Sequence, residues 1–410
     1  MLHMRSPITV ALLIATGASC GQAPVAPAPA LAPSSASTPA PGTASLSPDA
    51  ENRWVAFDLT PGNQIRFPVT LDGHGLTAIL DTGVSVTLLA RASAAVDPAR
   101  LSPGGQATAI GGDVPIEWMA TRSIGIGGLT RRGGAVAVAA LPALATGSGT
   151  AVDLLVGRDL LAGHALDIDY ANRRFRLLPS GRLPFAGASA PLAISPRRLV
   201  YESAIRLGGR TLKPMVVDTG DGSAITVTQV GWASAGLTQL PTTSAVAFGL
   251  AGPLVTTLAI VPALSVGQLD AASVEVRVEA EGGFSQAIGA AGRIGSGFLQ
   301  NYRVLLDPTA GRMVFQPGPT ADRAPLRSTS GLLLGILPDR LRVLHVMANG
   351  PAAAAGWRQG ETICTIDGTR VARDYATSPL AAWSVGAPGT LVRLGLCAGG
   401  ERTLRLARFY

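Results

Sequence analysis

The sequence predicts a mainly β protein with two β-barrel lobes related by pseudo-twofold symmetry, followed by a small α+β domain. The chain has 410 residues, which is long enough for two or three domains. Its 50 glycines and 30 prolines show no three-residue period, so they favour many short strands joined by turns. An internal repeat relates residues 69–90 to residues 205–227, whereas residues 331–410 carry a different pattern.

The composition excludes several classes of protein. Hydrophobic residues make up 47% of the chain, which is enough to form sizeable cores. The net charge of +7 comes from scattered arginines, with Lys213 as the only lysine, and this argues against a nucleic-acid surface. Four His and three Cys are too dispersed for a zinc site, and the HExxH and CxxC patterns are absent. We therefore expect no nucleic-acid partner, no metal and no cofactor.

Residues 1–20 predict an export signal. Arg5 supplies a positive charge, residues 8–15 are apolar, and small residues lead into Cys20. This order resembles a bacterial lipoprotein signal, which implies a lipid anchor on Cys20; the alternative is an ordinary secretory signal cleaved nearby. Residues 21–49 are rich in Pro, Ala, Ser and Thr without apolar periodicity, which predicts an extended tether. We expect an exported protein, either periplasmic or anchored to the envelope membrane.

The repeat beyond the tether indicates a duplication. Each copy has an alternating strand, a glycine turn, a second apolar strand and then Asp-Thr-Gly, beginning at Asp81 and at Asp218. An apolar segment that ends in glycine follows in each copy, at Gly157 and at Gly295. The offsets nearly agree, because 218 minus 81 is 137 and 295 minus 157 is 138. We therefore expect a first lobe over residues 50–188 and a second over residues 189–320.

Two Asp-Thr-Gly turns at a pseudo-twofold axis predict a specific chemistry. Glycine permits close backbone approach, and threonine can hydrogen-bond to the opposite lobe. Two carboxyl groups a few ångströms apart cannot both ionise easily, so they share one proton. One carboxylate can then take a proton from water while the other, protonated, polarises a carbonyl. Such a pair can hydrolyse an amide without a covalent intermediate.

Each repeat resembles a retropepsin-like aspartic protease unit, and the resemblance covers roughly residues 50–320. In that family the apolar segment ending in glycine supports the catalytic turn, and the fold is all β. The resemblance implies that Asp81 and Asp218 are the catalytic pair. It also implies that the following residues fix the geometry of the turns: Thr82, Gly83, Ser85, Thr219, Gly220 and Ser223.

Asp221 departs from the family pattern, in which alanine or a hydroxyl residue follows Asp-Thr-Gly; the first repeat has Val84 there. A third acidic group beside the pair raises the cost of ionisation. A one-residue insertion at Asp221 would align Ser85 with Ser223. The alternative is a degenerate second turn in which Asp218 has only a structural role.

Members of the family close a glycine-tipped hairpin over the substrate. The candidates here are residues 109–113 in the first lobe and residues 248–252 in the second. The alternative is that both are plain surface hairpins.

The C-terminal segment, residues 325–410, resembles a bacterial PDZ domain. The resemblance rests on the glycine-bracketed run from Gly331 to Ile336, on Asn349-Gly350-Pro351 and on Gln359-Gly360-Glu361. It implies a loop that binds the C-terminal carboxylate of a peptide, formed by Leu332, Leu333, Leu334 and Gly335. Cys364 and Cys397 lie in this module, and a disulfide and two free thiols are both compatible with the sequence.

The first hypothesis for the function is therefore an exported aspartic endopeptidase. It hydrolyses polypeptides with Asp81 and Asp218, and its PDZ module binds the C-termini of substrates or partners. The alternative is a catalytically impaired, protease-like scaffold that binds peptides without cleaving them.

Overall fold

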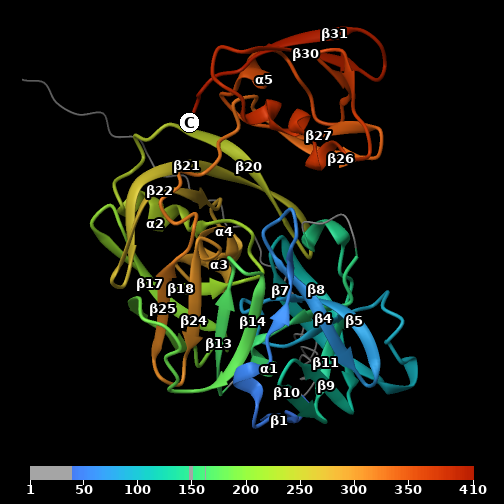
Figure 1. The fold of residues 1–410 in the computed structure, drawn as a ribbon, viewed down its shortest axis with the longest axis vertical. Coiled ribbons are helices and arrows are strands. Elements are labelled where there is room, and N and C mark those ends of the chain that lie inside the picture. Colours follow the sequence, from blue (N-terminus) through green and yellow to red (C-terminus); the bar gives the residue numbers. More distant parts are fainter. Residues whose placement is uncertain (1–38, 147–150, 162) are drawn as a thin grey trace, which may run out of the picture. The chain divides into compact units, whose positions relative to one another are not determined.

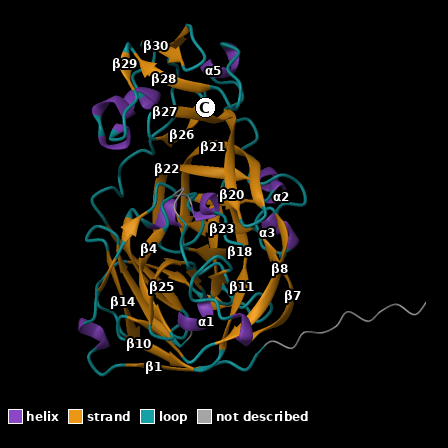
Figure 2. Cartoon of the chain, turned by 90° about the vertical axis from the view of Figure 1, so that its right-hand side faces the viewer, coloured by secondary structure: helices purple, strands orange, loops and turns teal. Residues whose placement is uncertain are grey.

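The structure, a computed structural model, describes residues 39–146, 151–161 and 163–410. The predicted export signal, with Cys20, and most of the predicted tether lie outside these residues. Strands account for 48% of the structure and helices for 11%, so the prediction of a mainly β protein is confirmed. Figure 2 shows the same predominance of strands over a few short helices. In the ranges described, no helix is both long and apolar enough to cross a membrane.

The first lobe is built on an 11-stranded sheet (Figure 1), with the strand order β1-β10-β9-β4-β5-β12-β6-β11-β8-β7 and with β3 paired to β4. Its strands are β1 (Thr43–Leu46), β3 (Asp58–Leu59), β4 (Ile65–Leu71), β5 (His74–Leu80), β6 (Leu88–Ala90), β7 (Leu101–Ala109), β8 (Gly112–Ala120), β9 (Ser123–Ile126), β10 (Leu129–Arg132), β11 (Ala135–Ala139) and β12 (Leu154–Val156). Helix α1 (Arg158–Leu161) follows β12, and 3₁₀ helices cover Ala50–Asn52, Pro98–Arg100 and Ala143–Thr146.

The second lobe is built on an eight-stranded sheet with the order β16-β17-β18-β23-β19-β22-β21-β20. Its strands are β16 (Ala193–Ile194), β17 (Tyr201–Leu207), β18 (Arg210–Asp218), β19 (Ile225–Val227), β20 (Thr242–Gly249), β21 (Gly252–Val266), β22 (Leu269–Val278) and β23 (Gly292–Gly295). Its helices are α2 (Gln229–Ser234), α3 (Phe284–Ala287) and α4 (Ser296–Leu299).

The two sheets have the same strand order over seven strands. The order β4-β5-β12-β6-β11-β8-β7 in the first lobe corresponds to β17-β18-β23-β19-β22-β21-β20 in the second. The central strands β5 and β12 are parallel, as are β18 and β23. This correspondence matches the duplication found in the sequence.

Burial explains why these segments form strands. In β4, with the sequence IRFPVTL, buried and more exposed residues alternate, which is typical of a strand with one face on a core. The three residues of β6, of β12 and of β19 are all buried, and so is the end of β5. Continuous apolar runs are expected of strands that are covered on both faces. The two Asp-Thr-Gly turns therefore come at the buried ends of β5 and β18.

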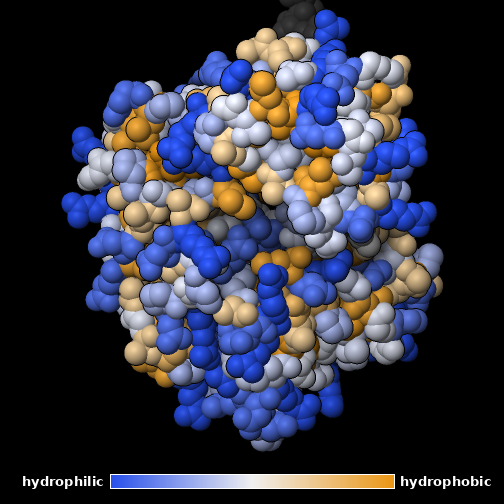
Figure 3. Space-filling view, turned by 45° about the horizontal axis from the view of Figure 1, so that its top comes forward, coloured by the Kyte–Doolittle hydropathy of each residue, from blue (hydrophilic) through white to orange (hydrophobic). Residues whose placement is uncertain are grey.

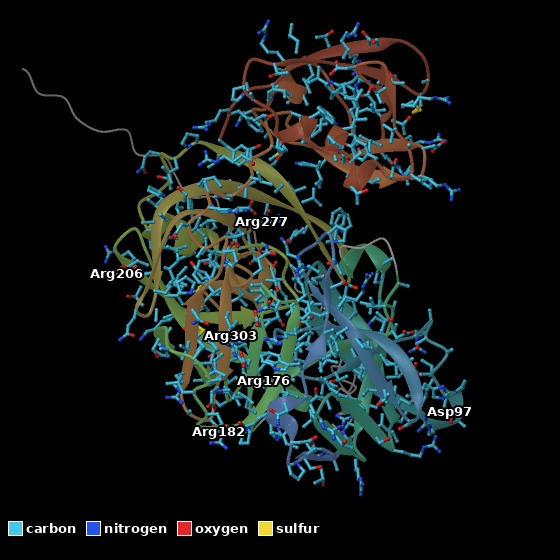
Figure 4. All side chains as sticks on the ribbon, viewed as in Figure 1. Asp97, Arg176, Arg182, Arg206, Arg277 and Arg303 are labelled. Carbon is cyan, nitrogen blue, oxygen red and sulfur yellow. A yellow bond between two sulfur atoms is a disulfide. The ribbon has the colours of Figure 1, made fainter. Side chains whose placement is uncertain are left out.

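A third sheet joins the two lobes, in the order β15-β25-β24-β13-β14-β2. Figure 1 shows β25, β24, β13 and β14 side by side. The strands are β2 (Val55–Ala56), β13 (His164–Asp169), β14 (Arg174–Pro179), β15 (Ala188–Pro191), β24 (Tyr302–Asp307) and β25 (Arg312–Pro317). At its centre the fully buried Asp167 accepts hydrogen bonds from Arg176 Nε at 2.9 Å and Arg303 Nη2 at 2.8 Å, and both arginines are labelled in Figure 4.

The C-terminal module has its own six-stranded sheet and its own apolar core. The order is β26-β27-β28-β30-β31, with β29 paired to β28, and the core contains Leu341, Trp357 and Leu394. The elements are β26 (Leu332–Leu337), β27 (Arg340–Val346), α5 (Pro351–Ala354), β28 (Thr362–Ile366), β29 (Thr369–Arg370), β30 (Leu391–Leu396) and β31 (Glu401–Arg405), with 3₁₀ helices at Tyr375–Thr377 and Pro379–Val385. Cys364 and Cys397, whose state the sequence left open, form a disulfide.

Two details differ from the sequence-based expectations. Strand β1 lies inside the predicted tether of residues 21–49; it pairs with β10, and Ala44 and Leu46 pack against the core. The predicted carboxylate loop, Leu332 to Gly335, lies in strand β26 and pairs with β27, so it is not a loop. In both segments, pairing with a strand distant in sequence decides the backbone conformation, and composition does not reveal such pairing.

On the face drawn in Figure 3, hydrophobic residues (orange) are dispersed among hydrophilic ones (blue). Isolated exposed hydrophobic side chains are normal for a folded domain.

Candidate active site

The two Asp-Thr-Gly turns face each other across the lobes. Asp81 follows β5 directly, and Asp218 is the last residue of β18. A methyl group added at Gly83 would overlap the carboxyl group of Asp218, and one added at Gly220 would overlap that of Asp81. Each glycine also donates its backbone N–H to the aspartate of its own turn, at 3.0 Å in both cases. Glycine is therefore required at both positions to let the carboxyl groups approach.

Reciprocal threonine hydrogen bonds join the turns. Thr82 N donates to Thr219 Oγ1 and Thr219 N donates to Thr82 Oγ1, both at 3.0 Å. The same hydroxyls donate to the carbonyls of Val217 and Leu80, both at 2.7 Å. Both threonines are fully buried, so these backbone groups have no access to water. The four bonds fix the position of one aspartate relative to the other.

The segments after β12 and β23 lie against the turns, as the sequence suggests. Asp81 N donates to Val156 O at 2.9 Å, and Ser296 Oγ donates to Thr219 O at 2.7 Å. At Gly157 a Cβ atom would lie 2.7 Å from the carbonyl carbon of Val86, and at Gly295 one would overlap the carbonyl of Ser223. These close approaches explain the glycine at the end of each apolar segment.

The ladder registers place one extra residue in the second turn. Leu155 pairs with both Ile79 and Leu88, and Arg293 pairs with both Val216 and Thr226. The offset is 216 minus 79, or 137, before the turn, and 226 minus 88, or 138, after it. This change of register agrees with the predicted insertion at Asp221.

The two serines of the predicted site have different surroundings. Ser85 is partly exposed and lines the cavity above the turns. Ser223 is 4% exposed, and both its N–H and its hydroxyl donate to Asp221 Oδ1, at 2.9 and 2.7 Å. Although the register aligns them, the two hydroxyls have different contacts.

Asp221 belongs to a buried ion-pair network that the sequence analysis missed. Arg293 Nε lies 2.8 Å from Asp221 Oδ2 and 3.8 Å from Asp218 Oδ2. Arg293 Nη1 lies 2.6 Å from Glu279 Oε1 and donates to Ser285 Oγ at 2.9 Å. A signal was present, because Arg293 is a charged residue in an otherwise apolar strand and therefore needs a counter-charge. The sequence does not show which acidic residues supply that counter-charge, because only the tertiary fold brings them to Arg293.

These charges set the protonation of the carboxyl groups. Burial, with the Asp218 and Asp221 charges, raises the pKa of Asp81 well above its usual range. Burial and the Asp221 carboxylate raise the pKa of Asp218 to about 6, although Arg293 acts in the opposite direction. Burial also acts to raise the pKa of Asp221, but Arg293 and hydrogen bonds from Ser223 outweigh it and lower this pKa to about 2. Asp221 is therefore ionised near neutral pH, whereas both members of the pair hold their protons to higher pH than an ordinary aspartate does.

A cavity of about 290 Å³ lies above the two aspartates, and most of its lining is apolar. The hairpins β7–β8 and β20–β21, which contain both candidate flaps, contribute Ile110, Val114, Phe248 and Leu250 to this lining. Their tips meet, because Ala251 N donates to Ile110 O at 3.2 Å. The hairpins are therefore more than plain surface loops, since they cover the cavity.

A turn of the first lobe also reaches the Asp-Thr-Gly turn of the second. Gln64 Nε2 donates to Gly220 O at 2.8 Å, and Asn63 Nδ2 donates to Gly222 O at 2.9 Å. The Pro61-Gly62 pair signals a turn in the sequence, but nothing there shows that it crosses between lobes.

Other predicted site residues are not at this cavity. Leu332, Leu333, Leu334 and Gly335 lie in the C-terminal module, and none of them lines it. Cys20, the predicted lipidation site, lies outside the described residues.

Replacing Thr82 or Thr219 by valine should lower the free energy of unfolding by about 2–4 kcal/mol, because each change leaves a buried N–H and a buried carbonyl without their partners. Urea denaturation measures this effect. Thr256→Val is the matched control, because Thr256 is also buried but forms only a 3.5 Å bond to Ala245 O. Equal effects at Thr82 and Thr256 would contradict the bracing role of the reciprocal bonds.

Comparison with known proteins does not assign the chain to a family. No family model matches the chain, and no curated protein matches it significantly.

Proposed function

We propose that this protein is an aspartic endopeptidase with two retropepsin-like lobes, whose Asp81 and Asp218 carboxyl groups activate water. The observation that carries this proposal is the reciprocal contact of the turns, in which each glycine adjoins the other turn's carboxyl. The apolar cavity above the pair, covered by two hairpins, provides room for an extended polypeptide with apolar side chains.

The proposed reaction uses the pair in one ionised and one protonated state. The carboxylate takes a proton from water, and the water oxygen attacks the carbonyl carbon of the peptide bond. The protonated carboxyl donates a hydrogen bond to the carbonyl oxygen as negative charge develops there. Transfer of a proton to the amide nitrogen then lets the C–N bond break, which yields a carboxylic acid and an amine.

The alternative, a scaffold that binds without cleaving, rested on Asp221. That carboxylate is paired with Arg293 at 2.8 Å and with Ser223, so it does not lie unpaired beside the catalytic pair. This arrangement favours the enzyme.

We further propose that residues 325–410 form a PDZ domain that binds peptide C-termini. Strand β26 supports this role, because it is an edge strand that pairs with β27 alone and has exposed Ile336 and Leu337 at its end. A free strand edge can accept an extended peptide as an additional strand. The Cys364–Cys397 disulfide supports an oxidising, exported location, with a lipid on Cys20 as the proposed anchor.

Asp81→Asn and Asp218→Asn should each lower kcat/KM for a reduced and alkylated polypeptide by about 10²–10⁴-fold, because an amide can neither accept nor share the proton. Asp58→Asn is the matched control, since the Asp58 side chain is 79% exposed. Normal cleavage by either catalytic variant would contradict the proposal.

The acid limb of the pH profile should lie near pH 6. As the pH falls through the Asp218 pKa of about 6, the second carboxyl becomes protonated and the base is lost. As the pH rises past the higher pKa of Asp81, the acid is lost, so activity falls again. Measuring kcat/KM against pH checks this expectation, and activity that is greatest far below pH 6 would contradict it.

Peptide binding by the PDZ module should require a free C-terminus. In the Asp81→Asn protein, which prevents cleavage, amidation should weaken binding of a fluorescent apolar peptide about tenfold or more, because charge-assisted hydrogen bonds are lost. Ile336→Lys should also weaken it, whereas Val230→Lys, at an exposed site on α2, should not. Equal affinity for free and amidated peptides would contradict the proposal that this module binds peptide C-termini.

A further inference from the structure

The duplicated halves differ at one buried position beside the catalytic pair. Leu155 in β12 and Arg293 in β23 occupy the same place, because each pairs with the strand that leads to an aspartate and with the strand after it. The first lobe thus has an apolar side chain where the second has a guanidinium. The surroundings of Asp81 and Asp218 are therefore not equivalent.

The position of Arg293 is fixed by its partners. The residue is 3% exposed, and its guanidinium contacts Asp221, Glu279 and Ser285 at distances of 2.6–2.9 Å. Glu279 is held in turn by the N–H of Ser285 at 2.8 Å. A cation held by this many contacts keeps its position when a nearby carboxyl gains or loses a proton.

Only one member of the pair has a cation nearby. Arg293 Nε lies 3.8 Å from Asp218 Oδ2, whereas Asp81 forms no ion pair within the described ranges. The other charged groups that bear on the pair are Asp221, which is bound to Arg293, and Arg198, which lines the cavity and is paired with Glu202. A neighbouring cation stabilises the ionised form of a carboxyl group, and more strongly so in a buried site.

We propose that Arg293 is a positioning residue that makes Asp218 the ionised base of the pair and leaves the shared proton on Asp81. This inference rests on the proposed function. It assigns the roles, so that Asp218 accepts the proton of water and Asp81 donates the hydrogen bond to the substrate carbonyl. Asp221 holds Arg293 in place through their ion pair. The negative charge of Asp221 also opposes the effect of Arg293 on Asp218, because it favours the protonated form of Asp218.

Two substitutions should shift the acid limb of kcat/KM in opposite directions. Arg293→Gln removes the cation and should move this limb to higher pH by about one unit or more. Asp221→Asn removes the opposing anion and frees Arg293 for Asp218, so the limb should move to lower pH by about one unit. A merely structural role would lower activity without moving the limb.

Arg293→Gln leaves buried acids unpaired and can prevent folding, so further variants are needed. Arg293→Lys keeps the positive charge, so Asp218 should still ionise before Asp81. Asp221→Asn tests the same network by changing the acidic partner of Arg293 and leaving the arginine in place. Arg131→Lys is the matched control, because Arg131 is equally buried in the first lobe and is paired with Asp159 at 2.9 Å. It should leave the acid limb in place even where it lowers stability.

A titration that needs no catalysis separates this inference from the proposed function. Infrared difference spectra of Asp81→Asn and Asp218→Asn, each measured against the double variant, report the protonation of the single remaining carboxyl. The remaining Asp218 should titrate at least about one unit below the remaining Asp81, and Arg293→Gln should abolish that difference. An inactive protein that shows the difference would refute the enzyme but support the asymmetry. Equal titration of the two carboxyls, or an acid limb that Asp221→Asn leaves unmoved, would overturn the inference.

Discussion

The reciprocal hydrogen bonds of Thr82 and Thr219 are the interaction on which the rest of the site depends. Each hydroxyl accepts an N–H from the opposite turn and donates to a carbonyl of the opposite strand, in a fully buried region. Breaking one bond leaves buried polar groups without partners, so the turns hold together as a unit. This unit sets the separation of Asp81 and Asp218, and the glycines make that separation possible.

The two lobes have different buried charges beside their Asp-Thr-Gly turns. In the first, Asp159 accepts hydrogen bonds from Thr87 and pairs with Arg131 at 2.9 Å. In the second, Arg293 pairs with Asp221 and Glu279. Buried ions are costly unless they are paired and hydrogen-bonded. The described partners of Arg293 meet that condition, whereas Arg131 is paired with Asp159 but its buried Nε has no hydrogen-bond partner among the described residues. Among the described residues, only the second network brings a cation close to one of the paired aspartates, so the repeated halves share a scaffold but differ in their buried charges.

The cover of the cavity is held by fewer hydrogen bonds than its floor. In the part of the chain that the structure describes, one backbone hydrogen bond, from Ala251 N to Ile110 O, joins the hairpin tips, whereas four buried bonds join the Asp-Thr-Gly turns. One such bond contributes about 1 kcal/mol net, so hydrogen bonding holds the tips less firmly than the turns, although Leu250 also packs against the apolar cluster that contains Trp118. Under the proposed function, this difference lets a polypeptide enter without disturbing the geometry that acts on it.

Local pattern and spacing were sufficient to predict the mainly β class, to show the internal repeat and to single out Asp81 and Asp218, because alternation, glycine turns and repeated motifs are properties of short segments. Which distant residues contact each other is not a property of a short segment. The disulfide, the pairing of β1 with β10, the strand at Leu332–Gly335 and the contact of Arg293 with Asp221 all join residues that are distant in sequence. Read alone, Asp221 was an unexplained third acid, and Arg293 was an unremarked residue of an apolar motif. The pairing of β23 with β18 and β19 brings the Arg293 guanidinium between Asp218, Asp221 and Glu279. The sequence could not show this arrangement, because the counter-charges that stabilise a buried charge are those that the tertiary fold places around it.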